Sequence, residues 1–473
     1  LDHFFPQIIV QDFYFPDGQI LEEDYVYGSF VQSKMYRNNI TCNNCHNSHS
    51  LKLKFDGNAL CAQCHIPATY DTPKHHFHKQ DTEGALCINC HMPGRYYMGN
   101  DFRRDHSFRV PRPDLTLKYG TPNACAGCHK DKSNQWAWDE FKKLFGTVDS
   151  IHFSDKLVPG ILGEPGADLG LSELIDDMKQ PEIVRASAVH ALAQYNSENL
   201  IDKFILLLND ESPLVRGTTL DLLSQINTTD YVNYFLPLLN DNKRSVRVKA
   251  FYAIAGLKES QIPEKYRERY EMVKKEFFDY LDVNLDFVGG QVRKGNYFLK
   301  QGNLQKGIEG YEKALKIDNS NNQIRMDLAN LYYRNQDYQK TEEAYKVVIN
   351  QEPEYGSAYY SLGLLYAELE RTDDAIKQMQ KASKLMPENI RVYYNLSLLY
   401  DKNEDNLNAE KTLLNGLKVD VNNESLLYAL AFQYSKLNQI EKAKTVLIKL
   451  VQLYPNNRDY QSFLQQILST RGN

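Results

Sequence analysis

The stretch Cys42-Asn43-Asn44-Cys45-His46 is the first of four copies of one pattern, C-x-x-C-H. The other copies lie at 61–65, 87–91 and 125–129, and the four together contain all eight cysteines of the chain. Two thiols three positions apart on one turn can each form a thioether with the same porphyrin, and the adjoining histidine then reaches the iron as its proximal ligand. The pattern therefore predicts four covalently bound haem c groups. The predicted thioether cysteines are Cys42, Cys45, Cys61, Cys64, Cys87, Cys90, Cys125 and Cys128, and the predicted proximal ligands are His46, His65, His91 and His129.

Zinc and disulfide bonds are the alternatives for paired cysteines. Two C-x-x-C pairs can hold one zinc ion, but zinc does not require a histidine directly after the second cysteine of every pair. Disulfide frameworks spread their cysteines to close long loops, whereas these cysteines are clustered. Four copies with no cysteine left over favour haem over both alternatives.

The sixth ligand of each iron decides between an electron carrier and a catalyst. Of the 12 histidines, four are proximal, and His152 and His190 fall in later helical regions. Six histidines remain for four positions, which favours bis-histidine ligation and low-spin iron. The candidate distal ligands are His49, His75, His76, His78 and His106, which we rank above His3. The methionines that could ligate instead are Met35, Met92 and Met98, although methionine more often fills core space.

The charge of this region suits the propionates of haem. Between Lys34 and Lys132 the chain has 14 Lys and Arg against 8 Asp and Glu, although its overall net charge is −6. Because a guanidinium grips a carboxylate with two hydrogen bonds, arginines are the favoured propionate partners. The candidates are Arg95, Arg103, Arg104, Arg109 and Arg112. The alternative is a solvated basic face for an acidic partner, and we expect no nucleic-acid partner for an acidic chain.

Length and composition bound the architecture. The 473 residues suffice for two to four domains, and 42% hydrophobic with 25% charged residues is ordinary for a soluble protein. No apolar run reaches about 18 residues, so no membrane span is expected. The chain opens at Leu1 with neither a signal peptide nor a translation start. We therefore expect a preceding segment with an export signal, and a periplasmic or extracellular location where such haems are attached.

Three segments between and around the haem motifs carry a resemblance to a known family. They are Asp24-Tyr-Val-Tyr-Gly-Ser-Phe30, His75-His-Phe-His78 and Asp105-His-Ser-Phe-Arg-Val-Pro-Arg-Pro-Asp114. With the motifs, they resemble the bacterial multihaem cytochromes c fused to tetratricopeptide repeats, relatives of the small tetrahaem electron carriers of nitrogen metabolism. The resemblance covers residues 10–140 closely and the remainder only in architecture. It implies further C-x-x-C-H motifs upstream, so that this chain would be the C-terminal part of a larger, octahaem protein.

The sequence before and after the motifs predicts an arm and a first helical array. Residues 1–40 are aromatic-rich and irregular, and we expect them to pack as an arm on a loop-rich haem domain at 41–150. The dipeptides Val184-Arg185, Val215-Arg216 and Val246-Arg247 recur every 31 residues. This period predicts HEAT-like helix pairs over 151–260, with each arginine bridging neighbouring turns. Residues 261–290 are expected to form a connecting helix.

The C-terminal part, residues 291–473, shows the 34-residue period of tetratricopeptide repeats. We predict five repeats and a capping helix over 458–470. The period is set by a small residue, at Gly295, Ala329, Gly363, Ser397 and Ala431, by an aromatic three positions later, at Phe298, Tyr332, Tyr366, Tyr400 and Tyr434, and by Pro353, Pro387 and Pro455.

One repeated position predicts a binding surface in addition to the packing of the repeats. Tyr360, Tyr394 and Tyr428 share one place in three successive repeats. We expect them to form a ladder in the groove of the repeats that binds an extended peptide or a partner helix through rigid aromatic surface. The alternative is that they only pack between repeats.

The expected fold is mostly α, a tetrahaem cytochrome c domain followed by an α-solenoid. The favoured function is electron transfer between a redox protein donor and acceptor, with the repeats docking a protein partner. A multihaem oxidoreductase acting on a small nitrogen or sulfur compound is the first alternative, and it needs one iron with an open distal site. A haem-bearing scaffold or filament subunit is the second. Whether the chain is itself an enzyme stays open.

Overall fold

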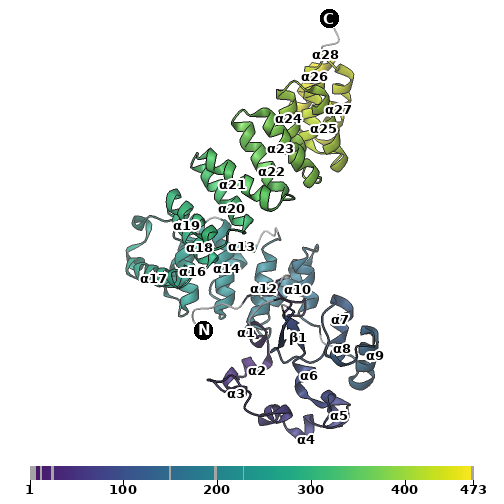
Figure 1. The fold of residues 1–473 in the computed structure, drawn as a ribbon, viewed down its shortest axis with the longest axis vertical. Coiled ribbons are helices and arrows are strands. Elements are labelled where there is room, and N and C mark those ends of the chain that lie inside the picture. Colours follow the sequence, from purple (N-terminus) through teal and green to yellow (C-terminus); the bar gives the residue numbers. More distant parts are fainter. Residues whose placement is uncertain are drawn as a thin grey trace. The chain divides into compact units, whose positions relative to one another are not determined.

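The computed structural model describes residues 7–10, 13–22, 26–97, 99–148, 151–195, 200–226 and 228–469. The chain divides into two compact units, Leu1–Phe277 and Phe278–Asn473 (Figure 1). Helices make up almost all of the regular structure in both units. None of the helices in the described part of the chain combines the length and the apolarity needed to span a bilayer.

The first unit opens with an arm that contacts two parts of the same unit. The arm contains α1 (Val26–Phe30) and α2 (Lys34–Arg37). The hydroxyl of Tyr97 donates to the carbonyl of Ile20 in the arm, which ties the arm to the motif region. The backbone N–H of Ile9 donates to Ser187 Oγ at 2.8 Å, so the arm also lies against the HEAT-like helices. The arm therefore contacts the HEAT-like helices as well as the motif region, on which it was expected to pack.

The motif region is a succession of short helical turns. They are α3 (Cys42–Cys45), η1 (Gly57–Gln63), α4 (Pro67–Tyr70), α5 (Pro73–His76), η2 (Glu83–Ala85), α6 (Cys87–His91), α7 (Pro113–Tyr119), α8 (Ala124–Cys128) and α9 (Asn134–Phe145). The sequence did not predict the small antiparallel sheet of β1 (Gly94–Tyr97) and β2 (Asp101–Arg104), in which Arg95 pairs with Arg103. Over residues 41–93 the single buried side chain is Ala85. Since a segment without buried side chains cannot build a core from its own residues, something else must complete it.

Helix pairs follow in the rest of the first unit. They are α10 (Ser154–Ile161), α11 (Ala167–Asp176), α12 (Glu182–Leu192), α13 (Leu200–Leu207), α14 (Pro213–Ile226), α15 (Thr228–Phe235), η3 (Leu236–Asn240), α16 (Arg244–Ala253), η4 (Glu259–Gln261) and α17 (Glu264–Val283), the last of which crosses into the second unit.

The repeated arginine joins successive helix pairs. Arg185 grips Asp210 with two hydrogen bonds and donates Nε to the carbonyl of Ile175. Arg216 and Arg247 occupy the same position in the next repeats. Arg216 donates two hydrogen bonds to the carboxylate of Asp241, and Arg247 donates two to the carboxylate of Glu276. The prediction that the Val-Arg step is a structural bridge is therefore confirmed.

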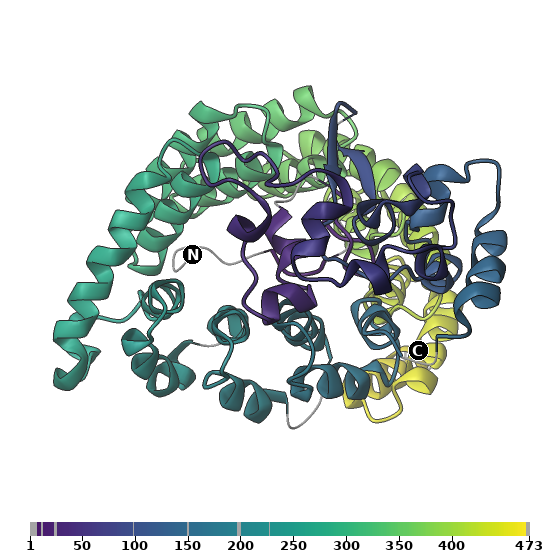
Figure 2. The same cartoon turned by 90° about the horizontal axis from the view of Figure 1, so that it is seen from below.

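The second unit is a stack of antiparallel helix pairs in chain order (Figures 1 and 2). The first helices of the pairs are α18 (Val288–Lys300), α20 (Asn322–Arg334), α22 (Gly356–Glu368), α24 (Ile390–Lys402) and α26 (Glu424–Lys436). The second helices are α19 (Leu304–Ile317), α21 (Tyr338–Gln351), α23 (Thr372–Leu385), α25 (Asn406–Val419) and α27 (Ile440–Leu453), and α28 (Arg458–Ser469) follows them. The first helix of the stack begins at Val288, within the segment 261–290 that was expected to form the connecting helix.

Local chemistry explains the 34-residue period. Two residues after each first helix ends, the chain has a residue in the left-handed region, with φ between 54° and 73°, which reverses the chain into the second helix. These residues are Gly302, Gln336, Glu370, Glu404 and Asn438. At the small positions, Ala329 and Ala431 are fully buried, and a Cβ on Gly363 would lie 3.0 Å from Met379 Cγ. The small residue therefore permits the close approach of the paired helices.

Candidate cofactor site

The four C-x-x-C-H motifs lie on helical turns that are exposed or half-buried. In α3, α6 and α8 both cysteines of a motif lie on the same turn, and in the second motif Cys64 directly follows η1. Residues three apart on a helical turn point to the same side. Each motif thus presents two thiols and, next to them, one imidazole, which is the donor set that haem c attachment needs.

The motifs follow one another closely in space. The thiols of Cys61 and Cys87, in the second and third motifs, share a hydrogen bond. Burial and then the nearby thiol of Cys64 raise the pKa of Cys45 in the first motif, and burial and then the nearby thiol of Cys125 raise the pKa of Cys90 in the third. Attachment points of successive motifs are therefore neighbours.

This arrangement supports zinc binding and disulfide bonds less well than it supports haem attachment. All eight cysteines are free thiols. In the portion of the chain that the structure describes, no three His, Cys, Asp or Glu side chains are grouped to hold a metal ion. A zinc site needs such a convergence of ligands from two motifs, whereas haem attachment uses the residues of one motif at a time.

Three proximal histidines each lie opposite one candidate distal histidine. The ring centroids of His46 and His106 are 6.4 Å apart with planes inclined by 25°. Those of His91 and His75 are 6.2 Å apart and inclined by 16°. A third pair, His129 and His78, has the same 6.2 Å separation and an inclination of 36°.

These separations match the geometry of two imidazoles on opposite sides of one metal ion. An imidazole nitrogen binds a metal at about 2.0–2.1 Å, and the ring centroid lies about 1.1 Å behind that nitrogen, so the centroids of two axial ligands are about 6.3 Å apart. Direct stacking or a direct hydrogen bond between the rings would bring them closer than this. The three pairs therefore fit an iron ion between their rings.

Hydrogen bonds at the other ring nitrogen set the tautomer for ligation. Nδ1–H donates to a backbone carbonyl in His46 (Leu51, 2.7 Å), His91 (Arg109, 2.9 Å), His106 (Arg104, 2.9 Å) and His78 (His76, 2.5 Å). A donor at Nδ1 leaves Nε2 with its lone pair, as in protein metal sites where the second nitrogen orients the ligand. Burial, and then the facing imidazole, lower the pKa of His106, which favours the neutral, ligating ring.

The fourth proximal histidine has a different neighbour. The ring of His65 meets Tyr70 edge-on at 5.7 Å, and Tyr70 in turn meets His75 at 5.5 Å. His49 is exposed, and none of its interactions in the described part of the chain involves His65. In His76, Nδ1 accepts from the backbone N–H of His78, which leaves the proton on a buried Nε2 without a partner. Among the described residues, none of the candidate distal histidines therefore lies opposite His65 as a second axial ligand would; His3 and Met98 lie outside those residues.

Apolar side chains around the motifs are exposed to an unusual degree. They include Leu51, at 74% exposure, and Leu53, Phe55, Ile66 and Phe77. A porphyrin offers a large apolar face, and covering these side chains with it would provide the core that residues 41–93 lack. The donor set and the exposed apolar surface both fit haem.

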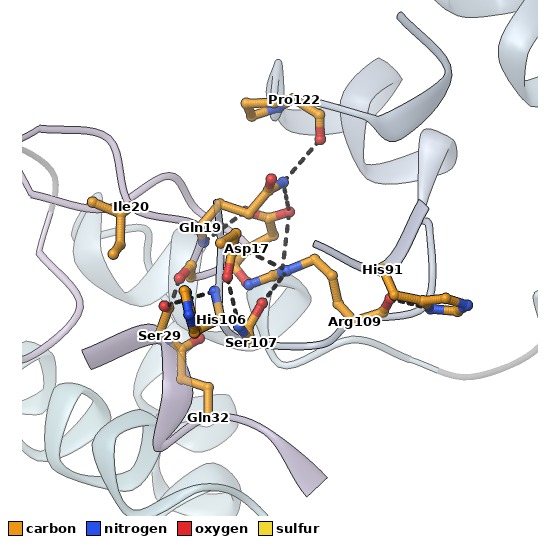
Figure 3. A network of polar contacts seen from close by, with 12 residues as sticks. Asp17, Gln19, Ile20, Ser29, Gln32, His91, His106, Ser107, Arg109 and Pro122 are labelled. Carbon is orange, nitrogen blue, oxygen red and sulfur yellow. Dashed lines mark hydrogen bonds and ion pairs between the residues drawn. The ribbon is translucent and has the colours of Figure 1, made fainter. Parts of the chain in front are cut away.

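Most of the candidate propionate arginines already have partners. Arg112 binds Asp114 with two hydrogen bonds, and Arg103 binds Asp101. Arg104 donates to the carbonyls of Ile88 and Met92, and Arg109 lies in a buried network with Asp17 (Figure 3). Arg95 differs, since its guanidinium packs over the rings of Phe15 and Tyr97 and makes neither a hydrogen bond nor an ion pair with any residue that the structure describes. Of the five, Arg95 is the guanidinium best placed to receive a propionate.

A histidine outside the ligand set has a perturbed pKa. His152 precedes α10, and its Nδ1 lies 2.6 Å from Ser154 Oγ. Burial, together with the nearby guanidinium groups of Arg109 and Arg112, lowers the pKa of His152 from 6.5 to about 3. The ring is therefore neutral at neutral pH.

We expect His152 to make the first unit sensitive to acid. The unfolded chain takes up a proton on this ring below about pH 6.5, whereas the folded ring stays neutral down to about pH 3. Its contribution to stability is therefore complete above the unfolded pKa and is lost as the pH falls towards the folded pKa. His152→Asn keeps an acceptor for Ser154, so the variant should lose less stability than the parent between about pH 7 and about pH 4 in urea unfolding. Equal losses would contradict this assignment.

The three tyrosines of the repeats differ in exposure. Tyr360 on α22 is half-buried, and its hydroxyl accepts from Asn395 Nδ2 of the next repeat at 2.8 Å. Tyr394 on α24 is also half-buried, whereas Tyr428 on α26 is 42% exposed and contacts Tyr460. Tyr360 thus packs between repeats, as the alternative interpretation proposed, while keeping part of its surface open.

A second apolar row lies one turn further along the same helices. Leu364, Leu398 and Phe432 are 41%, 46% and 53% exposed. Because residues four apart share one face of a helix, these side chains extend the tyrosine row. We call the six residues the apolar stripe. Sequence analysis missed this second row, although it recurs with the same 34-residue period.

Comparisons with known proteins identify the helical repeats. Residues 284–473 match the family described as the cilia and flagella-associated protein 70 C-terminal domain, and residues 170–255 match HEAT repeats. No curated protein sequence matches the chain.

Solved structures similar to this chain include three proteins with low sequence identity. MamA is 21% identical, with 33% of this chain and 92% of that chain covered and a TM-score of 0.31. YrrB, a TPR protein with an unusual peptide-binding site, is 18% identical, with 39% and 96% covered and a TM-score of 0.33. Pseudomonas aeruginosa pilF is 18% identical, with 47% and 99% covered and a TM-score of 0.33. The chain is accordingly a mostly helical repeat protein with HEAT-like and tetratricopeptide-like arrays.

Proposed function

We propose that this chain is a multihaem cytochrome c that carries electrons outside the cytoplasm and docks a protein partner on its helical repeats. The observation that carries the proposal is the set of three histidine pairs, each joining a C-x-x-C-H histidine to a distant one at 6.2–6.4 Å. Bound haem c would supply a one-electron Fe(III)/Fe(II) couple at each motif.

The residues of the chain support electron transfer rather than catalysis at three of the motifs. Cysteines on one turn would hold the cofactor by thioethers, which prevents its loss. Histidines on both sides of an iron would fill its axial positions and exclude added ligands. The contact between Cys61 and Cys87 brings two attachment points together, as a chain of short electron-transfer steps requires.

The partners follow from the same proposal. Covalent haem attachment takes place outside the cytoplasm, so the donor and the acceptor would be periplasmic or extracellular redox proteins. The apolar stripe of α22, α24 and α26 suits a protein segment with apolar anchor side chains, since rigid aromatic and aliphatic groups provide most of the binding energy at interfaces. The repeats would thereby tether a protein partner to the chain that carries the haems.

One observation favours a second candidate, an oxidoreductase acting on a small nitrogen or sulfur compound. In the described part of the chain, the ring that meets His65 belongs to Tyr70 rather than to a histidine. Such chemistry needs an iron with an exchangeable sixth position and a nearby proton donor.

One measurement separates the two candidates. We would quantify haem per chain in the purified ferric protein and record its EPR spectrum with and without cyanide, nitrite or hydroxylamine. Four haems, all low-spin and unchanged by these ligands, are expected for an electron carrier. One high-spin haem that binds such a ligand would support the oxidoreductase instead, and a protein exported with its cysteines intact but without haem would contradict both.

A further inference from the structure

A single short segment touches the axial histidines of two different motifs. His106, opposite His46 of the first motif, lies in this segment. Three residues later, the backbone carbonyl of Arg109 accepts the Nδ1–H of His91, the proximal histidine of the third motif, at 2.9 Å. Residues 104–109, which we call the ligand segment, therefore position one distal and one proximal imidazole (Figure 3).

The side chain of Arg109 anchors the ligand segment in buried surroundings. Its Nε donates to Ser107 Oγ at 2.7 Å and lies 3.5 Å from Asp105 Oδ2. Its Nη1 donates to the backbone carbonyl of Asp17 at 2.9 Å and lies 3.4 Å from the Asp17 carboxylate. Asp105 Oδ2 accepts no hydrogen bond, so the guanidinium is its charged partner. Displacing Arg109 would leave buried carboxylates without a countercharge, which is costly.

Asp17 belongs to the N-terminal arm and is itself fixed. The side chain is 2% exposed, and its Oδ2 accepts from Gln19 Nε2 at 2.7 Å. Gln19 also donates to the carbonyl of Pro122, just before the fourth motif. A second arm residue, Ser29, accepts the backbone N–H of His106 with its Oγ at 3.1 Å. The arm thus holds the ligand segment at both ends.

We propose that Asp17 is a positioning residue for the third haem iron, acting through Arg109 on His91. The proposal rests on the proposed function, because it presupposes haem at the third motif. Asp17 fixes the guanidinium of Arg109, and the anchored residue holds its carbonyl against His91 Nδ1–H. A hydrogen bond at that nitrogen orients the imidazole and raises its basicity. A more basic ligand favours Fe(III) and lowers the reduction potential of that one iron.

The first test removes the charge of Asp17 while keeping its shape. Asp17→Asn in the full haem-loaded chain should move one of the four midpoint potentials upward in a potentiometric titration and change the EPR signal of one haem. Asp114→Asn is the matched control, since it removes a carboxylate from Arg112 in the same region without reaching an axial histidine. The control should leave all four potentials at their parent values. Four unchanged potentials in Asp17→Asn would overturn the proposal.

Two further variants show which iron is affected and allow a test if Asp17→Asn does not fold. In the His75→Ala background the third iron loses its distal histidine and carries a high-spin signal, and adding Asp17→Asn should alter that signal. If Asp17→Asn does not fold, Ser107→Ala removes only the acceptor of Arg109 Nε and should shift the same potential upward by a smaller amount. A shift at any other haem would contradict the assignment. A chain that holds four haems but shows no shift overturns this inference alone, whereas a chain without haem overturns the proposed function.

Discussion

His106→Ala should convert one haem of the four from low-spin to high-spin. The ring of His106 lies opposite His46 at the separation of two axial ligands, and its Nδ1–H is bound to the carbonyl of Arg104. Its removal leaves an iron with the proximal ligand alone, so the ferric EPR spectrum should gain a high-spin signal and lose one low-spin signal. His75→Ala and His78→Ala should each do the same at a different iron.

Chemical rescue separates ligation from a general effect on structure. His106→Gly leaves space for an added imidazole, which should restore the low-spin spectrum, whereas a merely misfolded domain would not respond. His190→Ala is the control, since His190 is exposed on α12 in the HEAT-like array. A His106→Ala protein that keeps four low-spin haems would show that His106 is not the distal ligand of the first motif.

Arg185→Met should strongly destabilise the HEAT-like array. Arg185 and Asp210 are 4% and 8% exposed, and the arginine makes two hydrogen bonds to the carboxylate. Removing one partner of a buried pair leaves an uncompensated charge and costs about 3–5 kcal/mol. Because the chain has two units, hydrogen exchange of α11, α12 and α14 in the full chain is the suitable measurement, and it should show faster exchange in these helices.

Two further variants test the cause of this destabilisation. Arg247→Met should cost less, because its partner Glu276 is 25% exposed and water can solvate the carboxylate. The double variant Arg185→Met/Asp210→Leu should recover much of the loss, since apolar residues of similar volume replace a buried pair without a large penalty. If Arg185→Met and Arg247→Met accelerate hydrogen exchange equally, the burial of the ion pair does not determine how much stability its loss costs.

Sequence periodicity was enough to predict the helical repeats. The 34-residue and 31-residue periods arise because each repeat packs mainly on its neighbours, so the same side chains recur at the same places. Ala329 and Ala431 are buried where the pattern required a small residue, and Arg185 and Arg216 form the bridges that were expected of them. The same reasoning could have predicted the exposed row of Leu364, Leu398 and Phe432, because it follows the same 34-residue period.

Spacing alone could not determine which histidines face each other. The pairs His46 with His106 and His129 with His78 join residues far apart in the chain, and no local rule relates them. His49, three residues after the first motif, has no such pairing among the described residues, whereas the more distant His106 does. Three pairs emerged only once the short helices and loops of residues 41–129 were placed in space.

The sequence by itself determined the features that depend on neighbouring residues: the C-x-x-C-H attachment motifs, on which our proposal of haem rests, and the two repeat arrays. Only the tertiary structure decided the features that depend on distant residues meeting in a buried environment. Arg109 was expected to bind a propionate, yet burial places it against Asp17 and Asp105, where a guanidinium must stay to balance their charge. Nothing in the sequence pointed to a role for Asp17 at His91, because the proposed effect passes through contacts between three separate segments.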